Sequence, residues 1–161
     1  MLPEAGELAA RVRAGGLRVD AGCGPGNYLA ALGRPAVALD AAHAMLVLAR
    51  EAAPDVPGVQ ADLEALPFRR GALAGAWARN SYLHVPKARL PLALARLHDA
   101  LRVDAPLALT LISGDREGES FSVSLSFMPT PVTPARLNTS TRGGGPSAEV
   151  RLDARSSNPP A

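Results

Sequence analysis

Three glycines at alternate positions, Gly22, Gly24 and Gly26, follow an acidic residue, Asp20, at the end of an apolar run. Glycine has no Cβ atom, so a chain of this kind can turn sharply and bring its main-chain atoms close to a ligand. A helix is expected to begin after Gly26, and its first N–H groups would face the same point. The pattern favours a ligand-binding loop over a plain strand-to-helix turn.

The spacing of the glycines distinguishes two kinds of ligand. The pattern GxGxxG is typical of dinucleotide-binding sites, and its last glycine lets the helix pack closely on the strand. Asn27 occupies that last position here. The loop therefore favours a nucleoside without a pyrophosphate, and an NAD-dependent oxidoreductase is the less favoured alternative.

Further polar residues stand where other apolar runs end. Asp40 closes the run 36–40, Asp62 closes the run 59–62, and His84 follows the run 73–78. A carboxylate can accept hydrogen bonds from both hydroxyls of a ribose. His84 is a candidate general base, although lining of a cleft or a structural hydrogen bond also explains a histidine there. The three histidines show no metal-ligand spacing, so no metal is predicted.

The elements that must position these residues alternate between strand-like and helix-like patterns up to about residue 121. Strands are expected over 17–20, 36–40, 59–62, 73–78 and 107–113, and helices over 4–13, 27–32, 43–52 and about 90–101. This alternation is typical of a parallel sheet with helices on both faces. We therefore predict an α/β fold with a Rossmann-like, doubly wound parallel sheet in which five strands are recognisable.

The segment Val19-Asp20-Ala21-Gly22-Cys23-Gly24-Pro25-Gly26 resembles the first motif of class I methyltransferases that depend on S-adenosyl-L-methionine (SAM). The type it resembles is the small-molecule type, similar to ubiquinone and menaquinone biosynthesis methyltransferases. Segments 40–46, 61–68 and 78–85 resemble later motifs of the same family. The resemblance covers about residues 8–119, and it implies the class I methyltransferase fold and SAM as the cofactor.

The resemblance also implies a role for each matching residue. Asp20 and the glycine loop, with Cys23 as a small packing residue, would hold the methionine end of SAM. Asp40 would bind the ribose and Met45 would lie beside the adenosine, while the Asp62 side chain and the Leu63 N–H would recognise adenine. The residues implied to line the cofactor site are Asp20, Gly22, Cys23, Gly24, Gly26, Asp40, Ala41, Met45, Asp62, Leu63 and Asn80.

The family pattern breaks after Glu119. The family has seven strands, and its last two form an antiparallel hairpin that this sequence does not show, so the acceptor pocket is expected to be incomplete. We expect residues 1–121 to form an incomplete SAM-binding domain and residues 122–128, in which apolar residues alternate with serine, to form an edge strand. Residues 129–161, rich in Pro, Gly, Ser and Thr, are expected to be disordered.

The composition and charge of the chain limit the classes of partner that are expected. The formal net charge is +2, and no cluster of Lys and Arg with interleaved aromatics indicates nucleic acid. The one cysteine and the lack of an apolar run of about 18 residues predict a cytoplasmic protein without a membrane anchor. The leading hypothesis is an enzyme that methylates a small molecule, with a homo-oligomer through the exposed sheet edge as one arrangement. The alternative is a truncated, non-catalytic protein that binds SAM weakly or acts only through a partner.

Overall fold

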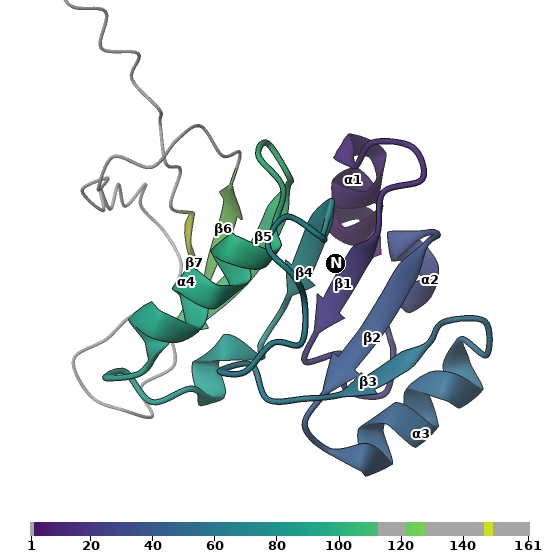
Figure 1. Cartoon of the computed structure of the whole chain (residues 1–161), viewed down its shortest axis with the longest axis horizontal. Helices are drawn as coiled ribbons and strands as arrows, with labels where there is room; N and C mark the ends of the chain where they lie inside the picture. Colours follow the sequence, from purple (N-terminus) through teal and green to yellow (C-terminus); the bar gives the residue numbers. More distant parts are fainter. Residues whose placement is uncertain (1, 113–121, 128–146, 150–161) are drawn as a thin grey trace, which may run out of the picture.

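One sheet of seven strands, in the order β3-β2-β1-β4-β5-β6-β7, organises the chain (Figure 1). The structure is a computed structural model, and it describes residues 2–112, 122–127 and 147–149. The strands are β1 (Arg18–Ala21), β2 (Ala36–Asp40), β3 (Gly58–Gln60), β4 (Gly75–Ala78), β5 (Leu107–Ile112), β6 (Ser122–Phe127) and β7 (Ser147–Glu149). The helices are α1 (Leu2–Arg11), α2 (Leu29–Leu32), α3 (His43–Ala52), the 3-10 helix η1 (Tyr82–His84) and α4 (Leu90–Ala100).

The first five strands are parallel, and their order reverses beside β1. The chain runs from β1 outward to β2 and β3, and then crosses back to place β4 on the other side of β1. In open parallel sheets, the loops at such a switch point diverge and leave a crevice at the carboxyl ends of the strands. The fold thus provides a crevice where β1 and β4 end.

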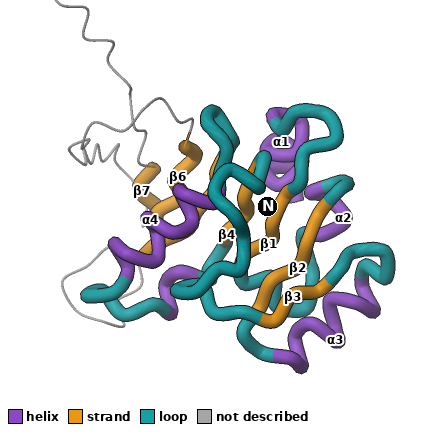
Figure 2. The backbone as a smooth tube through the Cα atoms, in the orientation of Figure 1, coloured by secondary structure: helices purple, strands orange, loops and turns teal. Residues whose placement is uncertain are grey.

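Alternation along the strands divides the core into two layers. Val37 and Leu39 point to one face of β2, where they join the cluster beneath α4, and Ala36 and Ala38 point to the other face beneath α3. Both sets are buried, as expected for a parallel strand covered by helices on both sides. Figure 2 shows the strands side by side in one row with helices around them.

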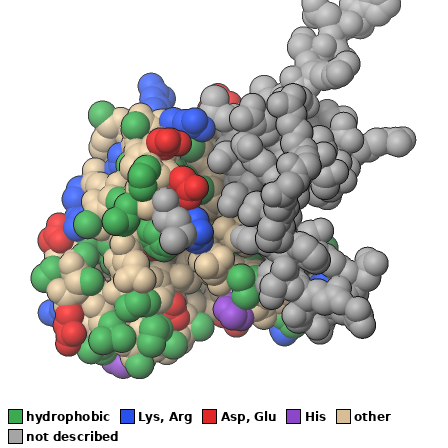
Figure 3. All heavy atoms as spheres, turned by 180° about the vertical axis from the view of Figure 1, so that it is seen from behind, with side chains coloured by type: hydrophobic (Ala, Val, Ile, Leu, Met, Phe, Trp, Pro, Cys, Tyr) green, Lys and Arg blue, Asp and Glu red, His purple; other side chains and the backbone are tan. Residues whose placement is uncertain are grey.

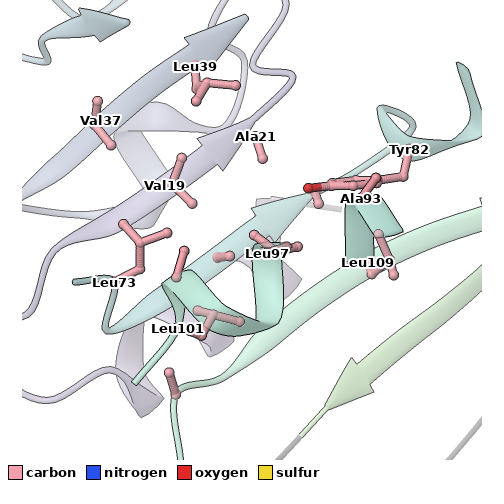
Figure 4. Close-up of a cluster of buried hydrophobic side chains, with 14 of the residues drawn as sticks. Val19, Ala21, Val37, Leu39, Leu73, Tyr82, Ala93, Leu97, Leu101 and Leu109 are labelled. Atoms are coloured by element: carbon pink, nitrogen blue, oxygen red, sulfur yellow. The ribbon is translucent and has the colours of Figure 1, made fainter. Parts of the chain in front are cut away.

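The cluster beneath α4 is almost wholly aliphatic. Leu97 and Ala93 of α4 belong to the same cluster as Val19 of β1, and the ring of Tyr82 lies beside Ala93 (Figure 4). On the opposite face, α1 packs on β4 and α2, and the rings of Tyr28 and Trp77 lie 5.1 Å apart between their centroids. Both faces of the sheet are therefore closed around β1 and β4, which fixes the ends of these strands.

The predicted α/β fold with a doubly wound parallel sheet is confirmed, and the structure differs from the prediction in some details. The helix expected over 27–32 starts at Leu29, because residues 27 and 28 form a turn after the glycine loop. Because α2 has only four residues, little helix dipole develops at its N-terminus. The main-chain N–H groups that could face a ligand here are therefore those of the glycine loop. β6 falls in the interval 122–128, where an edge strand is expected, whereas β7 lies outside all of the expected strands.

The part of the chain after residue 112 changes the expected edge. β6 lies within the interval 122–128 and pairs antiparallel with β5, but β7 covers its other side, so β6 is not the edge of the sheet. Residues 147–149, within the interval 129–161 that is expected to be disordered, form β7 by pairing with the backbone of β6. β6 and β7 run parallel, unlike the family's hairpin. The rest of that tail lies outside the described residues.

The described surface carries both signs of charge. On the face seen in Figure 3, Lys and Arg side chains are scattered among Asp, Glu and apolar side chains. Within residues 2–112, 122–127 and 147–149, no helix is long and apolar enough to span a lipid bilayer.

Candidate functional site

A cavity of about 580 Å³ opens where β1, β2, β3 and β4 end, at the switch point of the sheet. The loops after these four strands supply its walls, and the start of α4 forms part of its rim. The described residues that line it are Gly22, Gly24, Asp40, Ala41, Asp62, Leu63, Glu64, Asn80, Ser81, His84, Val85, Pro86 and Arg89. A ligand of nucleoside size fits this volume, since ligand cavities in proteins range from about 300 to 1,000 Å³.

The glycine loop forms the floor of the cavity, and the absence of a Cβ atom serves a different purpose at Gly26 and at Gly24. Gly26 has φ +86°, and a Cβ atom there would lie 2.9 Å from Cα of Ala49 in α3, so only glycine allows the loop to pack on that helix. Gly24 has φ +52°, and a Cβ atom there would meet nothing within 4 Å, because this glycine faces the cavity. The first is needed for packing, and the second keeps the cavity open.

Asp20 lies directly beneath the loop. It is 1% exposed, and it stands on β1 between Ala38 of β2 and Trp77 of β4. Its Oδ2 atom is buried with no hydrogen-bond partner in the described part of the chain. Burial, reinforced by the nearby charge of Asp40, raises the pKa of Asp20 from 3.8 to about 7. A buried carboxylate that lacks a donor is costly to keep ionised, so this position is suited to receive a cationic or hydrogen-bond-donating ligand group.

Asp40 ties two walls of the cavity together. Its Oδ2 atom accepts a hydrogen bond from the Gly24 N–H at 2.9 Å, and its Oδ1 atom accepts one from the Ala42 N–H at 2.9 Å. Ala42 is the N-cap residue of α3 and has no side chain that could cap the helix. One carboxylate thus fixes both the glycine loop and the entry into α3, and its remaining lone pairs are available to a ligand.

A tight turn after β3 forms the opposite wall. The Asp62 Oδ1 atom accepts a hydrogen bond from the Glu64 N–H at 2.9 Å, and the Asp62 carbonyl accepts one from the Ala65 N–H at 2.9 Å. An Asp side chain that binds the main chain two residues later is typical of such turns. The turn sets the direction of the Asp62 carboxylate and brings Leu63 against the cavity.

The segment after β4 and the start of α4 complete the rim. Asn80 adopts φ +55°, in the left-handed region, which turns the chain sharply as it leaves β4. Asparagine tolerates this conformation better than most residues. His84 lies in η1 and is exposed on the rim, and an ion pair between Glu64 and Arg89 of 3.1 Å spans the two sides.

The structure therefore brings together most, but not all, of the residues singled out in the sequence. Eight of them line the cavity: Gly22, Gly24, Asp40, Ala41, Asp62, Leu63, Asn80 and His84. Four do not line it. Asp20 and Gly26 lie in or beneath the loop, and Met45 lies on α3. Cys23 is buried, and burial raises the pKa of its thiol to about 12, with Asp20 and Asp40 adding to the effect, which agrees with a neutral packing residue.

Sequence reasoning passed over several lining residues. Glu64 and Ser81 fall within segments that resemble family motifs, but no feature of the sequence alone marked either residue. Arg89 precedes α4, and only its contact with Glu64 gives it significance. Within the described ranges, no group of three His, Cys, Asp or Glu side chains is placed to hold a metal ion.

A family model described as "Methyltransferase domain" matches residues 19–104, which is more than half of the chain and contains the whole cavity lining. A search of curated protein sequences found no significant match.

Solved structures resemble the chain in fold. A putative SAM-dependent methyltransferase from Methanococcus maripaludis has a TM-score of 0.60 at 20% identity, over 69% of this chain and 55% of that one. A putative methyltransferase from Bacillus halodurans has a TM-score of 0.62 at 21% identity, over 72% and 53%. A SAM-bound amino pentose methyltransferase from Micromonospora echinaspora has a TM-score of 0.58 at 24% identity, over 66% and 49%. The chain spans about half the length of these proteins.

Proposed function

The chain belongs to the class I SAM-dependent methyltransferases, and from this membership we propose that the cavity described above holds SAM and presents its methyl group to a small-molecule acceptor. SAM is the cofactor of the family. The assignment of individual residues to parts of SAM, the class of acceptor and the activity of this chain are the substance of the proposal.

The observation that carries the proposal is a row of three carboxylates at the ends of three neighbouring strands. Asp20 belongs to β1, Asp40 ends β2 and Asp62 follows β3, and all three lie around or beneath the same cavity. SAM offers three hydrogen-bond-donating groups along its length, namely the ammonium, the ribose hydroxyls and the adenine amino group. Carboxylates form charge-assisted hydrogen bonds with each of these donors.

The residues present fit this ligand. The buried, unpartnered oxygen of Asp20 would gain a partner from the ammonium of the methionine end. Gly24 leaves the cavity floor open and its main chain accessible, and Asp40 has lone pairs left for the ribose hydroxyls. Asp62, whose direction the turn fixes, would accept from the adenine amino group, and the Leu63 N–H would reach a ring nitrogen.

Catalysis at such a site requires mainly alignment. SAM supplies a methyl group bonded to a positively charged sulfur, which a nucleophile attacks when it is held in line. The chain's part is to fix the cofactor and to line the place of the acceptor, where Asn80 and Val85 contribute to the cavity. If the acceptor must lose a proton, the exposed imidazole of His84 on the rim would take it.

The alternative function is that of a non-catalytic methyltransferase-like protein, which binds SAM weakly or acts only through a partner. Family and cavity are the same in both cases. The two differ only in whether S-adenosylhomocysteine is produced when acceptors are supplied.

Binding of SAM and of S-adenosylhomocysteine, measured by calorimetry on the folded chain, tests the proposal. We expect Asp40→Asn to weaken binding by about tenfold or more, because it removes a charge-assisted acceptor and loosens the Gly24 loop. Asp55→Asn is the matched control, since Asp55 is an exposed carboxylate that pairs with Arg34 and does not line the cavity. Equal binding by the two variants, or no binding by a wild-type chain with native circular dichroism, would contradict the proposal.

A screen of small nucleophiles then separates enzyme from binding protein. Release of S-adenosylhomocysteine with any acceptor above the rate without acceptor supports the methyltransferase. A chain that binds SAM tightly and releases none with phenol, amine, thiol and carboxylate acceptors would favour the non-catalytic alternative.

A further inference from the structure

An ion pair crosses the mouth of the cavity between two segments that are far apart in the sequence. The Arg89 Nη1 atom lies 3.1 Å from the Glu64 Oε1 atom, and both residues line the cavity. Glu64 belongs to the turn after β3, whereas Arg89 is the N-cap residue of α4. The ion pair thus joins the two walls at the rim of the cavity.

The two partners differ in exposure. The Glu64 side chain is 25% exposed and the Arg89 side chain is 61% exposed. A pair between freely exposed side chains contributes little, because water screens it and both chains lose freedom. Glu64 is partly withdrawn from water, so its carboxylate depends more on Arg89 than a surface carboxylate would.

The main chain of Glu64 transmits this contact to Asp62. The Glu64 N–H donates to the Asp62 Oδ1 atom at 2.9 Å, so the residue held by Arg89 is the same residue that directs the Asp62 carboxylate. The ion pair of Glu64 is thus linked, through the Glu64 N–H, to the carboxylate of Asp62 two residues earlier. Loss of the ion pair frees the Glu64 side chain and, through it, the turn.

The charges on the rim also favour the ion pair. Among the described lining residues, Asp40, Asp62 and Glu64 carry negative charge, and Arg89 is the residue with a permanent positive charge. Without Arg89, the Glu64 carboxylate would repel that of Asp62 in the same short turn. The repulsion would drive the turn toward open conformations that do not present Asp62 to the cavity.

We propose that Glu64 and Arg89 are positioning residues, whose ion pair holds the Asp62 carboxylate in the direction that recognises the adenine amino group. This inference rests on the proposed function, since it assumes that the turn faces adenine. The pair makes the binding-competent turn the main population of the free protein. When that population falls, apparent affinity falls by the same factor.

The test compares two ligands that differ only at the base. S-adenosylhomocysteine carries the amino group, and S-inosylhomocysteine carries a carbonyl oxygen in its place. We expect the wild type to prefer the first, and we expect Glu64→Gln and Arg89→Gln to reduce that preference by about threefold to fivefold. Arg89→Lys keeps the charge and should restore most of the preference.

A double-mutant cycle and a matched control complete the design. In Glu64→Gln with Arg89→Gln, the preference should fall no further than in either single variant, because both remove the same interaction. Arg70→Gln is the control, since Arg70 forms an ion pair of the same length, 3.1 Å, with Asp99 and neither residue lines the cavity. Thermal unfolding of each variant shows whether the chain is folded, and a merely structural role would weaken both ligands alike.

The possible outcomes distinguish the role of the ion pair from the binding of SAM. An unchanged preference in folded Glu64→Gln and Arg89→Gln, or additive losses in the double variant, would overturn the role of the ion pair while leaving SAM binding intact. Failure of the wild type to bind S-adenosylhomocysteine would overturn the proposed function, and the inference with it.

Discussion

Replacing Asp20 with asparagine should stabilise the folded protein at alkaline pH and not at acidic pH. The Asp20 carboxyl is almost fully buried, and its Oδ2 atom has no hydrogen-bond partner in the described part of the chain. Burial first, and the charge of Asp40 second, raise its pKa from 3.8 to about 7. Ionising this group in the folded state is therefore unfavourable, and an amide of the same shape avoids the ionisation.

The magnitude follows from the shift in pKa. A rise from 3.8 to about 7 corresponds to about 4 kcal/mol of preference for the protonated form. Between these two values the folded chain holds a proton that the unfolded chain has released, so stability falls as pH rises. The loss is complete above about pH 7. Water near the carboxyl and rearrangement of the surrounding residues reduce this effect, and we expect a difference of about 2 to 3 kcal/mol.

Urea unfolding of the wild type and of Asp20→Asn at about pH 5 and about pH 8 measures the effect. The difference in free energy of unfolding between the two proteins should favour the variant strongly at the higher pH and much less at the lower pH. Other titrating groups contribute equally to both proteins and cancel in this difference. A variant that is destabilised by the same amount at both pH values would refute the reasoning, because it would show that the carboxyl is satisfied in the folded chain.

Three further predictions concern the same site and its surroundings. Binding of SAM at about pH 6 should release close to one proton per molecule, and almost none above about pH 8, because the ligand's ammonium favours ionised Asp20. Calorimetry in two buffers of different ionisation enthalpy counts the released protons. Equal counts at both pH values would contradict this link between binding and the ionisation of Asp20. Gly26→Ala should lower the free energy of unfolding by about 2 kcal/mol, because the added methyl group meets Ala49. Gly24→Ala should lower it by only about 1 kcal/mol but should reduce SAM affinity more than tenfold. Urea unfolding and calorimetry measure the two effects, and a larger loss of stability for Gly24→Ala with a larger loss of affinity for Gly26→Ala would contradict this packing of the loop. Tyr82→Phe should leave the free energy of unfolding unchanged or raise it by about 1 kcal/mol, since the Tyr82 hydroxyl is buried without a hydrogen-bond partner among the described residues. A loss of about 1 kcal/mol in thermal unfolding would show that the hydroxyl forms a hydrogen bond.

The regular elements follow from local pattern where the pattern is strong. The strand 36–40, a continuous apolar run that Asp40 closes, and the helix 43–52 are found with the bounds that the sequence predicts. Bounds shift where a side chain competes with the ladder. β3 ends at Gln60 because Asp62 begins a turn with its own carboxylate, and Leu73 forms an isolated bridge with Leu101 before β4 begins.

Other features depend on contacts that no local pattern contains. α2 begins at Leu29, after the glycine loop in which Gly26 packs against Ala49 of α3, a residue distant in the sequence. β7 has three residues, too few for a period, and exists through its pairing with β6.

The cavity shows the same division. The carboxylates and glycines could be singled out because each stands at the end of a strand-like run, where a parallel sheet gathers its ligand-binding groups. The Glu64 and Arg89 pair could not, since an ion pair between a turn and a helix start has no signature in either segment alone. The sequence thus indicates which strand ends meet, but not which side chains close the space between them.

The position of the cavity lining along the chain has a consequence for variation between relatives. Every described lining residue lies between Gly22 and Arg89, and β5, β6 and β7 contribute none. Insertions, exchanges or fusions after α4 can therefore alter what lies beside the cavity without replacing any of these side chains. The segment 22–89 can be inherited as a unit while the sequence that follows it diversifies.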